Sequence, residues 1–298
     1  ANVKGEGNEW TVSLYSFGDK LVCRGKGKRF VVKSPKLWSA EEPNCYKVVV
    51  SLAQGGKTLE SVSTLFGFRE SKIIKGRYCL NGQKVKLHGA DRHETDPRYG
   101  HFCPRERHEQ DVALLKRANC NMVRNSHYPQ DDYWYYLCDL NGICLMDEAN
   151  VESHGIWNVT PREERFRKAL VWRNMNMVER NMNHPAVIFW SHGNECGSGR
   201  NFRAADDAVH QRDPSRPTHY EGDWSNSDVD SNMYPSVNLV WWHAKDKNAK
   251  RPYYICEYAH NMVNAMGNLK DYQDAIESSD VILGHRRDDL GLGGPRAL

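Results

Sequence analysis

Apolar and polar residues alternate in short runs from residue 9 to about residue 65. Clear runs cover residues 10–14, 21–23, 30–32 and 46–50, and Gly and Pro residues separate them. A period of two residues is typical of strands that bury one face. This pattern predicts a small β-sandwich, or most of one, at residues 1–69.

After about residue 70, short apolar segments alternate with segments of helical period. Helices are expected at residues 107–118, 131–140, 163–183, 202–211 and 269–277. Strands are expected at residues 85–88, 122–124, 143–146, 187–190, 218–220, 231–234 and 253–256. The alternation predicts an α/β fold at residues 70–298, a (β/α)8 barrel whose eighth strand is missing or corrupted. A doubly wound open sheet is the alternative, which the lack of a Gly-rich phosphate loop after the first strand disfavours.

The composition is that of a globular protein and gives no sign of nucleic-acid binding or of a membrane span. The 298 residues, 39% of them hydrophobic, can bury a large core. The net charge is only +3 and the basic residues are dispersed, so we expect no nucleic-acid partner. No apolar run reaches the ~18 residues of a membrane span. Nine cysteines without a C-x-x-C pair predict reduced thiols and a cytoplasmic location.

Ionisable side chains directly follow most of the predicted strands. They lie at residues 91–94, 124–127, 147–154, 191–195, 234 and 257–260. The C-terminal ends of barrel strands share one face, and active sites of this fold are built there. We therefore expect these side chains to converge on a single cleft.

Two acids, Glu195 and Glu257, come at the ends of buried strands. Burial and charged neighbours can tune such acids for proton transfer. A facing pair of carboxyl groups is what glycosidic bond cleavage requires. The simpler interpretation is that each acid pairs with Arg92 or Arg124. For two acids beside two arginines and several histidines, we favour catalysis.

Several motifs resemble glycoside hydrolase family two. The shorter ones are residues 125–129, 190–195 and 256–260. Longer matches at residues 91–94, 147–155, 213–217 and 220–222 resemble its large bacterial-type β-galactosidases. The resemblance extends to about Leu283. It implies an Ig-like domain at residues 1–69 and most of a catalytic barrel at residues 70–298.

The resemblance also implies an activity, the hydrolysis of terminal β-D-galactosides such as lactose. Glu195, beside Asn194, would be the acid/base and Glu257 the nucleophile. The reaction would retain the anomeric configuration through a covalent galactosyl-enzyme. The two carboxyl groups are then expected about 5–5.5 Å apart, since inverting enzymes need about 6.5–9.5 Å.

Other site residues follow from the same resemblance. It implies that His93, His127 and His260 grip sugar hydroxyls, and that Tyr234 contacts the nucleophile. Arg124 would orient Glu257 through a charge-assisted hydrogen bond. A purely structural ion pair at Arg124 is the alternative.

A metal site is expected from Glu152, His154 and Glu195. The chemistry of these ligands leaves Mn²⁺, Zn²⁺ and Mg²⁺ open, because histidine is unusual for Mg²⁺. The resemblance implies Mg²⁺, no organic cofactor, and a homo-oligomer for the full-length protein. Without the resemblance, the simpler interpretation is that His154 only hydrogen-bonds to nearby backbone.

The segment from Gly284 to Leu298 departs from the family. The resemblance implies a Trp-x-Trp-Val-Asp-Gln-Gly stretch in strand eight, but this segment is charged and Gly-rich. Synonymous codons for residues 290–296 exist for which the next reading frame encodes Trp-Asp-Trp-Val-Asp-Gln. We therefore hypothesise a frameshift. We expect a C-terminally truncated, open barrel with exposed edges on strands one and seven.

Two further functions stay open. A β-glucuronidase or β-mannosidase of the same family is one alternative, although no Asn-x-Lys motif is placed to hold a substrate carboxylate. The other is an inactive, truncated fragment that only binds carbohydrate.

Overall fold

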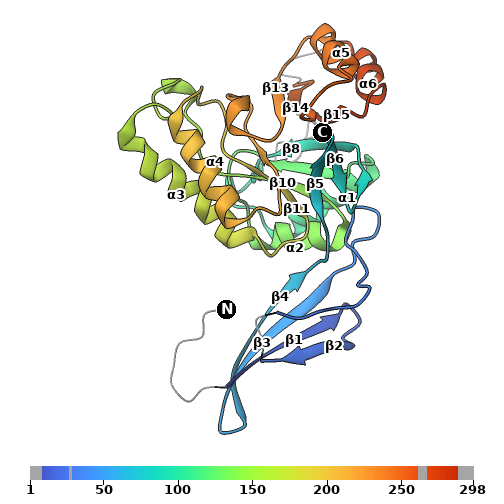
Figure 1. Cartoon of the computed structure of the whole chain (residues 1–298), viewed down its shortest axis with the longest axis vertical. Coiled ribbons are helices and arrows are strands. Elements are labelled where there is room, and N and C mark those ends of the chain that lie inside the picture. The colour runs from blue at the N-terminus through green and yellow to red at the C-terminus, as the bar shows by residue number, and fades with distance from the viewer. Residues whose placement is uncertain (1–8, 27–28, 261–266, 288–298) are drawn as a thin grey trace.

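The structure is a computed structural model that describes residues 9–26, 29–260 and 267–287. Figure 1 shows an elongated sheet formed by the first strands and, beside it, a barrel of strands surrounded by helices. Within these ranges, no helix combines the length and the apolar character that a membrane crossing requires.

The N-terminal part is an antiparallel sheet in the order β2-β1-β3-β4. Its strands are β1 (Glu9–Ser16), β2 (Leu21–Gly25), β3 (Tyr46–Gln54) and β4 (Lys57–Phe66). Gly55 and Gly56 join β3 to β4 with positive φ angles of 57° and 79°, which a tight two-residue hairpin requires. The predicted small β-domain is thus present, and the described residues form one sheet layer of it.

A second antiparallel sheet, which the sequence did not predict, leads into the barrel. It consists of β5 (Ser71–Ile74), β6 (Arg77–Leu80) and β7 (Gln83–Lys84). The Ser71 hydroxyl donates to the carbonyl of Ile188 (3.1 Å). The buried ring of Tyr78 lies 4.7 Å from that of Phe189. These contacts pack the sheet against the fourth barrel strand.

Eight parallel strands form the barrel, in the order β12-β11-β10-β9-β8-β15-β14-β13. They are β8 (Leu87–Arg92), β9 (Met122–Asn125), β10 (Cys144–Glu148), β11 (Val187–Ser191), β12 (Thr218–His219), β13 (Asp230–Met233), β14 (Tyr253–Tyr258) and β15 (Ile282–Arg287). The first seven lie at or close to the predicted positions. The (β/α)8 prediction is therefore confirmed.

The expectation of a missing eighth strand is wrong. β15 lies between β14 and β8 and pairs with both, so strands one and seven are not open edges. Gly284 pairs with Leu87, whose carbonyl oxygen lies only 2.0 Å from where a Cβ would stand. Only glycine allows this approach. The strand is apolar only at Ile282 and Leu283, because Gly284 is followed by His285, Arg286 and Arg287, and this is why the sequence did not reveal it. Residues 288–298 of the hypothesised frameshift lie outside the described residues.

Helices cover the outside of the barrel (Figure 1). They are α1 (Arg105–Arg117), α2 (Asp132–Asn141), α3 (Glu164–Asn181), α4 (Arg200–Arg212), α5 (Val237–Lys245) and α6 (Leu269–Glu277), with short 3-10 helices η1 (His154–Ile156) and η2 (Trp224–Asn226). The sequence predicted five of the α-helices but not α5. The apolar stretch of α5 is rich in valine and tryptophan, which have weak helix propensity. The Ser236 side chain starts this helix by accepting a hydrogen bond from the Leu239 amide.

The barrel has one seam that backbone pairing does not close. β12 and β13 stand at the two ends of the sheet order. Across this seam His219 Nε2 lies 3.0 Å from the Ser231 hydroxyl. On the β12 side, His219 Nδ1 lies 3.0 Å from Ser191 Oγ of the neighbouring strand β11. Buried side chains thus complete the ring of strands where the ladder stops.

Lys86 connects the start of the barrel to its end. Its ammonium group donates to the carbonyls of Ile276 (2.7 Å), Ser279 (2.5 Å) and Ile282 (2.7 Å). All three ammonium protons are therefore used between the end of α6 and the start of β15. Lys86 holds the eighth strand against the first.

We expect Lys86→Met to lower the free energy of unfolding by about 2 kcal/mol, because it removes charged hydrogen bonds from partly buried carbonyls. Chemical denaturation of the whole chain measures this. Lys84→Met is the matched control, since Lys84 pairs with Asp280 on the surface and should cost at most about 0.5 kcal/mol. Equal effects of the two substitutions would contradict the role of Lys86.

Candidate active site

Both predicted acids lie at the C-terminal end of the barrel. Glu257 is the last but one residue of β14, and Glu195 follows β11 by four residues. The tips of β9 and β10 bring Arg124 and Glu148 to the same end. Since the strands are parallel, residues far apart in sequence meet here.

Two donors hold the Glu257 carboxylate. Arg124 Nη1 donates to one of its oxygens and the Tyr234 hydroxyl to the other, both at 2.8 Å. The Tyr234 amide also donates to the Glu257 carbonyl (2.8 Å), with Tyr234 at a φ of 47°. A left-handed tyrosine is uncommon and persists only where its surroundings fix it. Glu257 is 8% exposed, so its orientation is closely determined.

Arg124 is the centre of the polar contacts in the site. Its fully buried guanidinium also donates to both oxygens of Glu148 (2.7 and 3.1 Å) and to Asn194 Oδ1 (2.6 Å). Asp91 lies 3.6 Å away. Burial opposes the charge, but Glu148, Asp91 and Glu257 outweigh it and raise the pKa of Arg124 well above its usual value. The group is a fixed cation that links four strand ends.

Glu148 also belongs to the site, which the sequence did not reveal. Besides Arg124 it contacts His127 Nδ1 (2.7 Å) and accepts from the Ser191 hydroxyl (2.6 Å). Burial alone would raise its pKa, but Arg124 and the hydrogen bonds from His127 and Ser191 lower it to about 2. Glu148 is therefore a permanent anion that balances Arg124. Its place after a buried strand, in the matched motif at residues 147–155, was the available signal.

Glu195 stands on a tightly shaped loop. Its own φ is 44°, and Gly193 before it has a φ of 151°. A Cβ at Gly193 would stand 2.5 Å from the Val151 carbonyl oxygen, which accepts a hydrogen bond from the Asn194 amide (2.8 Å). Glycine at this position lets the loop pass close to the segment that follows β10. The Glu195 side chain is 28% exposed, and His154 Nδ1 lies 3.0 Å from Oε2.

Two of the three predicted sugar-binding histidines lie together. The rings of His93 and His127 are 5.2 Å apart at 81°. Burial, and then the nearby His127, lower the pKa of His93, so its ring is neutral at pH 7. His260 is exposed two residues after β14, and the next residues, 261–266, lie outside the described ranges.

The predicted metal ligands are neighbours but do not converge. Glu152 Oε2 accepts from the Asn194 side chain (2.6 Å), while His154 contacts Glu195. Across the described ranges, no three His, Cys, Asp or Glu side chains are arranged to hold a metal ion. To hold an ion together, Glu152, His154 and Glu195 would have to leave these contacts.

Glu221, which follows β12, is a further acid whose part in the site was not predicted. Burial is the largest effect and raises the pKa of Glu221. Arg124 lowers this pKa, whereas the carboxylates of Glu257 and Glu195 raise it further. The result is a pKa of about 7, so this carboxyl group is partly protonated near neutral pH. With Glu148, Glu195 and Glu257 it makes four glutamates in the site.

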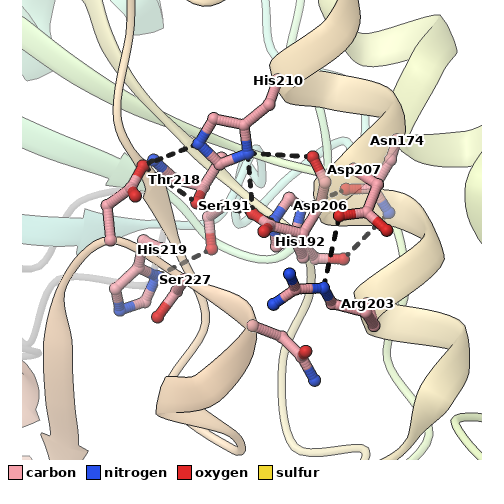
Figure 2. A network of polar contacts seen from close by, with 12 residues as sticks. Asn174, Ser191, His192, Arg203, Asp206, Asp207, His210, Thr218, His219 and Ser227 are labelled. Atoms are coloured by element: carbon pink, nitrogen blue, oxygen red, sulfur yellow. Dashed lines mark hydrogen bonds and ion pairs between the residues drawn. The ribbon is translucent and has the colours of Figure 1, made fainter.

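A polar network behind the site braces the end of β11 (Figure 2). His192 contacts Asn174 Oδ1 through Nδ1 (2.8 Å) and Asp206 Oδ1 through Nε2 (3.0 Å). His210 lies between Asp206 (3.2 Å) and Asp228 (2.9 Å). These contacts tie α3 and α4 to the strand that carries Glu195.

A parallel eight-stranded barrel with acidic side chains at its strand tips is the arrangement of barrel-type glycoside hydrolases. The family model described as "Glycosyl hydrolases family 2, TIM barrel domain" matches residues 71–288. A second, described as "Glycosyl hydrolases family 2", matches residues 3–69. The chain therefore belongs to glycosyl hydrolase family 2.

Similar proteins include two bacterial β-galactosidases. That of Photobacterium profundum is 40% identical over 262 residues, covering 82% of this chain and 25% of the relative. That of Priestia megaterium is 38% identical over 269 residues, covering 85% and 26%. The chain thus spans about a quarter of the length of these relatives. A β-glucuronidase from Ruminococcus gnavus shares the fold, with a TM-score of 0.80 at 22% identity over 95% of this chain and 57% of that chain.

The network of Figure 2 makes stability depend on pH. Asp206 and Asp228 raise the pKa of His210 from its ordinary 6.5 to about 10. Protonated His210 therefore stabilises the fold fully below pH 6.5, and this contribution is lost as the pH rises through 10. We expect His210→Gln to lower the midpoint of thermal unfolding by about 2 °C at pH 6, given solvent screening, and by less at pH 10. His101→Gln, at an exposed position outside the network, is the control. A difference that does not change with pH would contradict this account.

Proposed function

We propose that this chain is the catalytic part of a retaining β-galactosidase. The observation that carries the proposal is the carboxylate of Glu257, which Arg124 and Tyr234 hold at the same barrel end as Glu195. The identity of about 40% to named β-galactosidases supports the choice of sugar. The resemblance in motifs supports the assignment of roles.

In the first step, Glu257 attacks the anomeric carbon while Glu195 protonates the departing oxygen. The surroundings of each acid suit its role. The hydrogen bonds from Arg124 and Tyr234 aim the Glu257 oxygens, as a nucleophile needs. Glu195 is more exposed and contacts an imidazole, which suits a group that exchanges protons.

In the second step, Glu195 takes a proton from water, which displaces Glu257 from the sugar. Two inversions at one carbon retain the configuration. This mechanism predicts the carboxyl separation of about 5–5.5 Å stated above. Asn194, which donates to Glu152 and accepts from Arg124, is proposed to orient the sugar with His93, His127 and His260.

The charges around the site favour an uncharged sugar over a uronate. The acids Glu148, Glu195, Glu221 and Glu257 surround one buried cation, Arg124, which is already paired with Glu148 and Glu257. A substrate carboxylate would add like charge in a poorly solvated site. A β-glucuronidase or β-mannosidase and a non-catalytic fragment are the alternatives that the assay must separate.

The first test is hydrolysis of 4-nitrophenyl β-D-galactoside, β-D-glucuronide and β-D-mannoside by the 298-residue chain. We expect turnover of the galactoside alone. We expect Glu195→Gln to lower kcat by about 10²–10⁴-fold and Glu257→Gln to abolish turnover. Glu60→Gln, on the exposed face of β4, is the control and should leave kcat unchanged. Preference for another sugar would overturn the substrate. No turnover by the folded chain would favour the binding fragment.

Magnesium is a separate proposal, held by Glu152, His154 and Glu195. Binding an ion there requires Glu152 to give up its bond to Asn194, so no step above passes through the metal. We expect calorimetric titration with Mg²⁺ to detect one site in the wild-type chain, and its loss in Glu152→Gln and His154→Ala. Glu60→Gln should bind as the wild type does. Absence of binding to the wild type would refute the proposal.

A further inference from the structure

The segment after β10 forms a fixed rim beside Glu195. The Ser153 and Thr160 hydroxyls are hydrogen-bonded at 2.6 Å. The amide of Asn158 donates to the Cys196 carbonyl (2.8 Å), and Asn158 Oδ1 accepts from the Ser198 amide (2.9 Å). The rim is therefore bonded to the same loop that carries Glu195.

This rim presents two large apolar side chains to solvent, Ile156 (48% exposed) and Trp157 (46% exposed). A single exposed apolar residue is ordinary and needs no explanation. Trp157 differs from such a residue because it stands on a rigid, hydrogen-bonded rim. Its ring is already held in place, so a ligand that binds it loses little side-chain entropy.

A chain of contacts leads from Trp157 to the proposed acid/base. The Trp157 ring lies 5.5 Å from the His154 ring at 61°. His154 Nδ1 in turn lies 3.0 Å from Glu195 Oε2. One imidazole ring therefore separates the indole from the carboxyl group.

The proposed mechanism determines which part of the substrate lies beside Glu195. The acid protonates the oxygen of the leaving group, so the leaving group lies on the side of Glu195. The sugar that becomes bonded to Glu257 lies on the other side of the scissile bond. Trp157 is connected to the site through His154 and Glu195, on the side of the acid that faces the leaving group in this mechanism.

We propose that Trp157 is a stacking platform for the ring of the leaving group, whether a second sugar or an aryl group. The inference rests on the proposed function and deepens it. Both kinds of ring suit the negative π face of an indole. A sugar ring presents positively polarised C–H groups to it, and an aryl ring packs on it offset or edge-on. Trp157 is then a specificity-determining residue that selects ring-bearing galactosides over those with small leaving groups.

The test compares Trp157→Ala with Trp172→Ala. Trp172 is exposed and belongs to α3, a helix on the outside of the barrel (Figure 1). The substrates are lactose, phenyl β-D-galactoside and methyl β-D-galactoside. We expect Trp157→Ala to lower kcat/KM about tenfold for the first two, a typical loss for a stacked ring, and to change it less than twofold for the methyl galactoside. Trp172→Ala should change none of the three. Equal losses on all three substrates, or no loss, would overturn the proposal.

A binding measurement separates this proposal from the proposed function. If the wild-type chain hydrolyses none of the substrates, the proposed function fails, and calorimetry with phenyl β-D-thiogalactoside then decides about Trp157. The platform predicts affinity about tenfold weaker in Trp157→Ala than in the wild type and Trp172→Ala, with methyl β-D-thiogalactoside unaffected. Equal affinities, or no binding to any of the three chains, would refute it.

Discussion

The buried guanidinium of Arg124 is the constraint on which the rest of the site depends. A charge without access to water is stable only when its hydrogen bonds are completed by well-placed partners. Arg124 finds them on three other strand ends, in Glu148, Asn194 and Glu257. Because the fork of an arginine is planar and rigid, these partners are fixed relative to one another as well as to the cation. Arg124 thus fixes Glu257 directly and constrains Glu195 through its neighbour Asn194.

The hydrogen bonds that neutralise Arg124 are also connected to the closure of the barrel. Glu148 accepts from Ser191, Ser191 contacts His219, and His219 contacts Ser231 across the seam. The chain of contacts that fills the gap between β12 and β13 therefore ends on the counter-ion of Arg124. Behind it, His192 and His210 brace the end of β11 from the helical layer. Fold closure and site geometry use one continuous set of buried polar groups, so neither can relax alone.

The sequence predicted most of the barrel and the residues that gather at its end, and the reason is physical. Parallel strands place their C-terminal ends together, so Arg124, Glu195 and Glu257 could be grouped from their positions after apolar runs. What it did not reveal depends on pairing and packing between distant segments. β15 has little apolar pattern, because Gly284 approaches the Leu87 backbone closely and three basic residues follow it. α5 is helical despite its composition. Glu148 and Glu221 owe their properties to neighbours on other strands.

The side-chain seam has a consequence for how the molecule can be divided. The segment between residues 220 and 229 joins the two sides of the barrel where no backbone ladder crosses. A cut there would break no strand pairing. It would leave β8 to β12 on one piece and β13 to β15 on the other, still joined by the β8–β15 ladder and by Lys86. Glu195 would belong to the first piece, and Tyr234 and Glu257 to the second. Neither piece holds both of the proposed acids, so the site would be complete only after the two pieces reassemble.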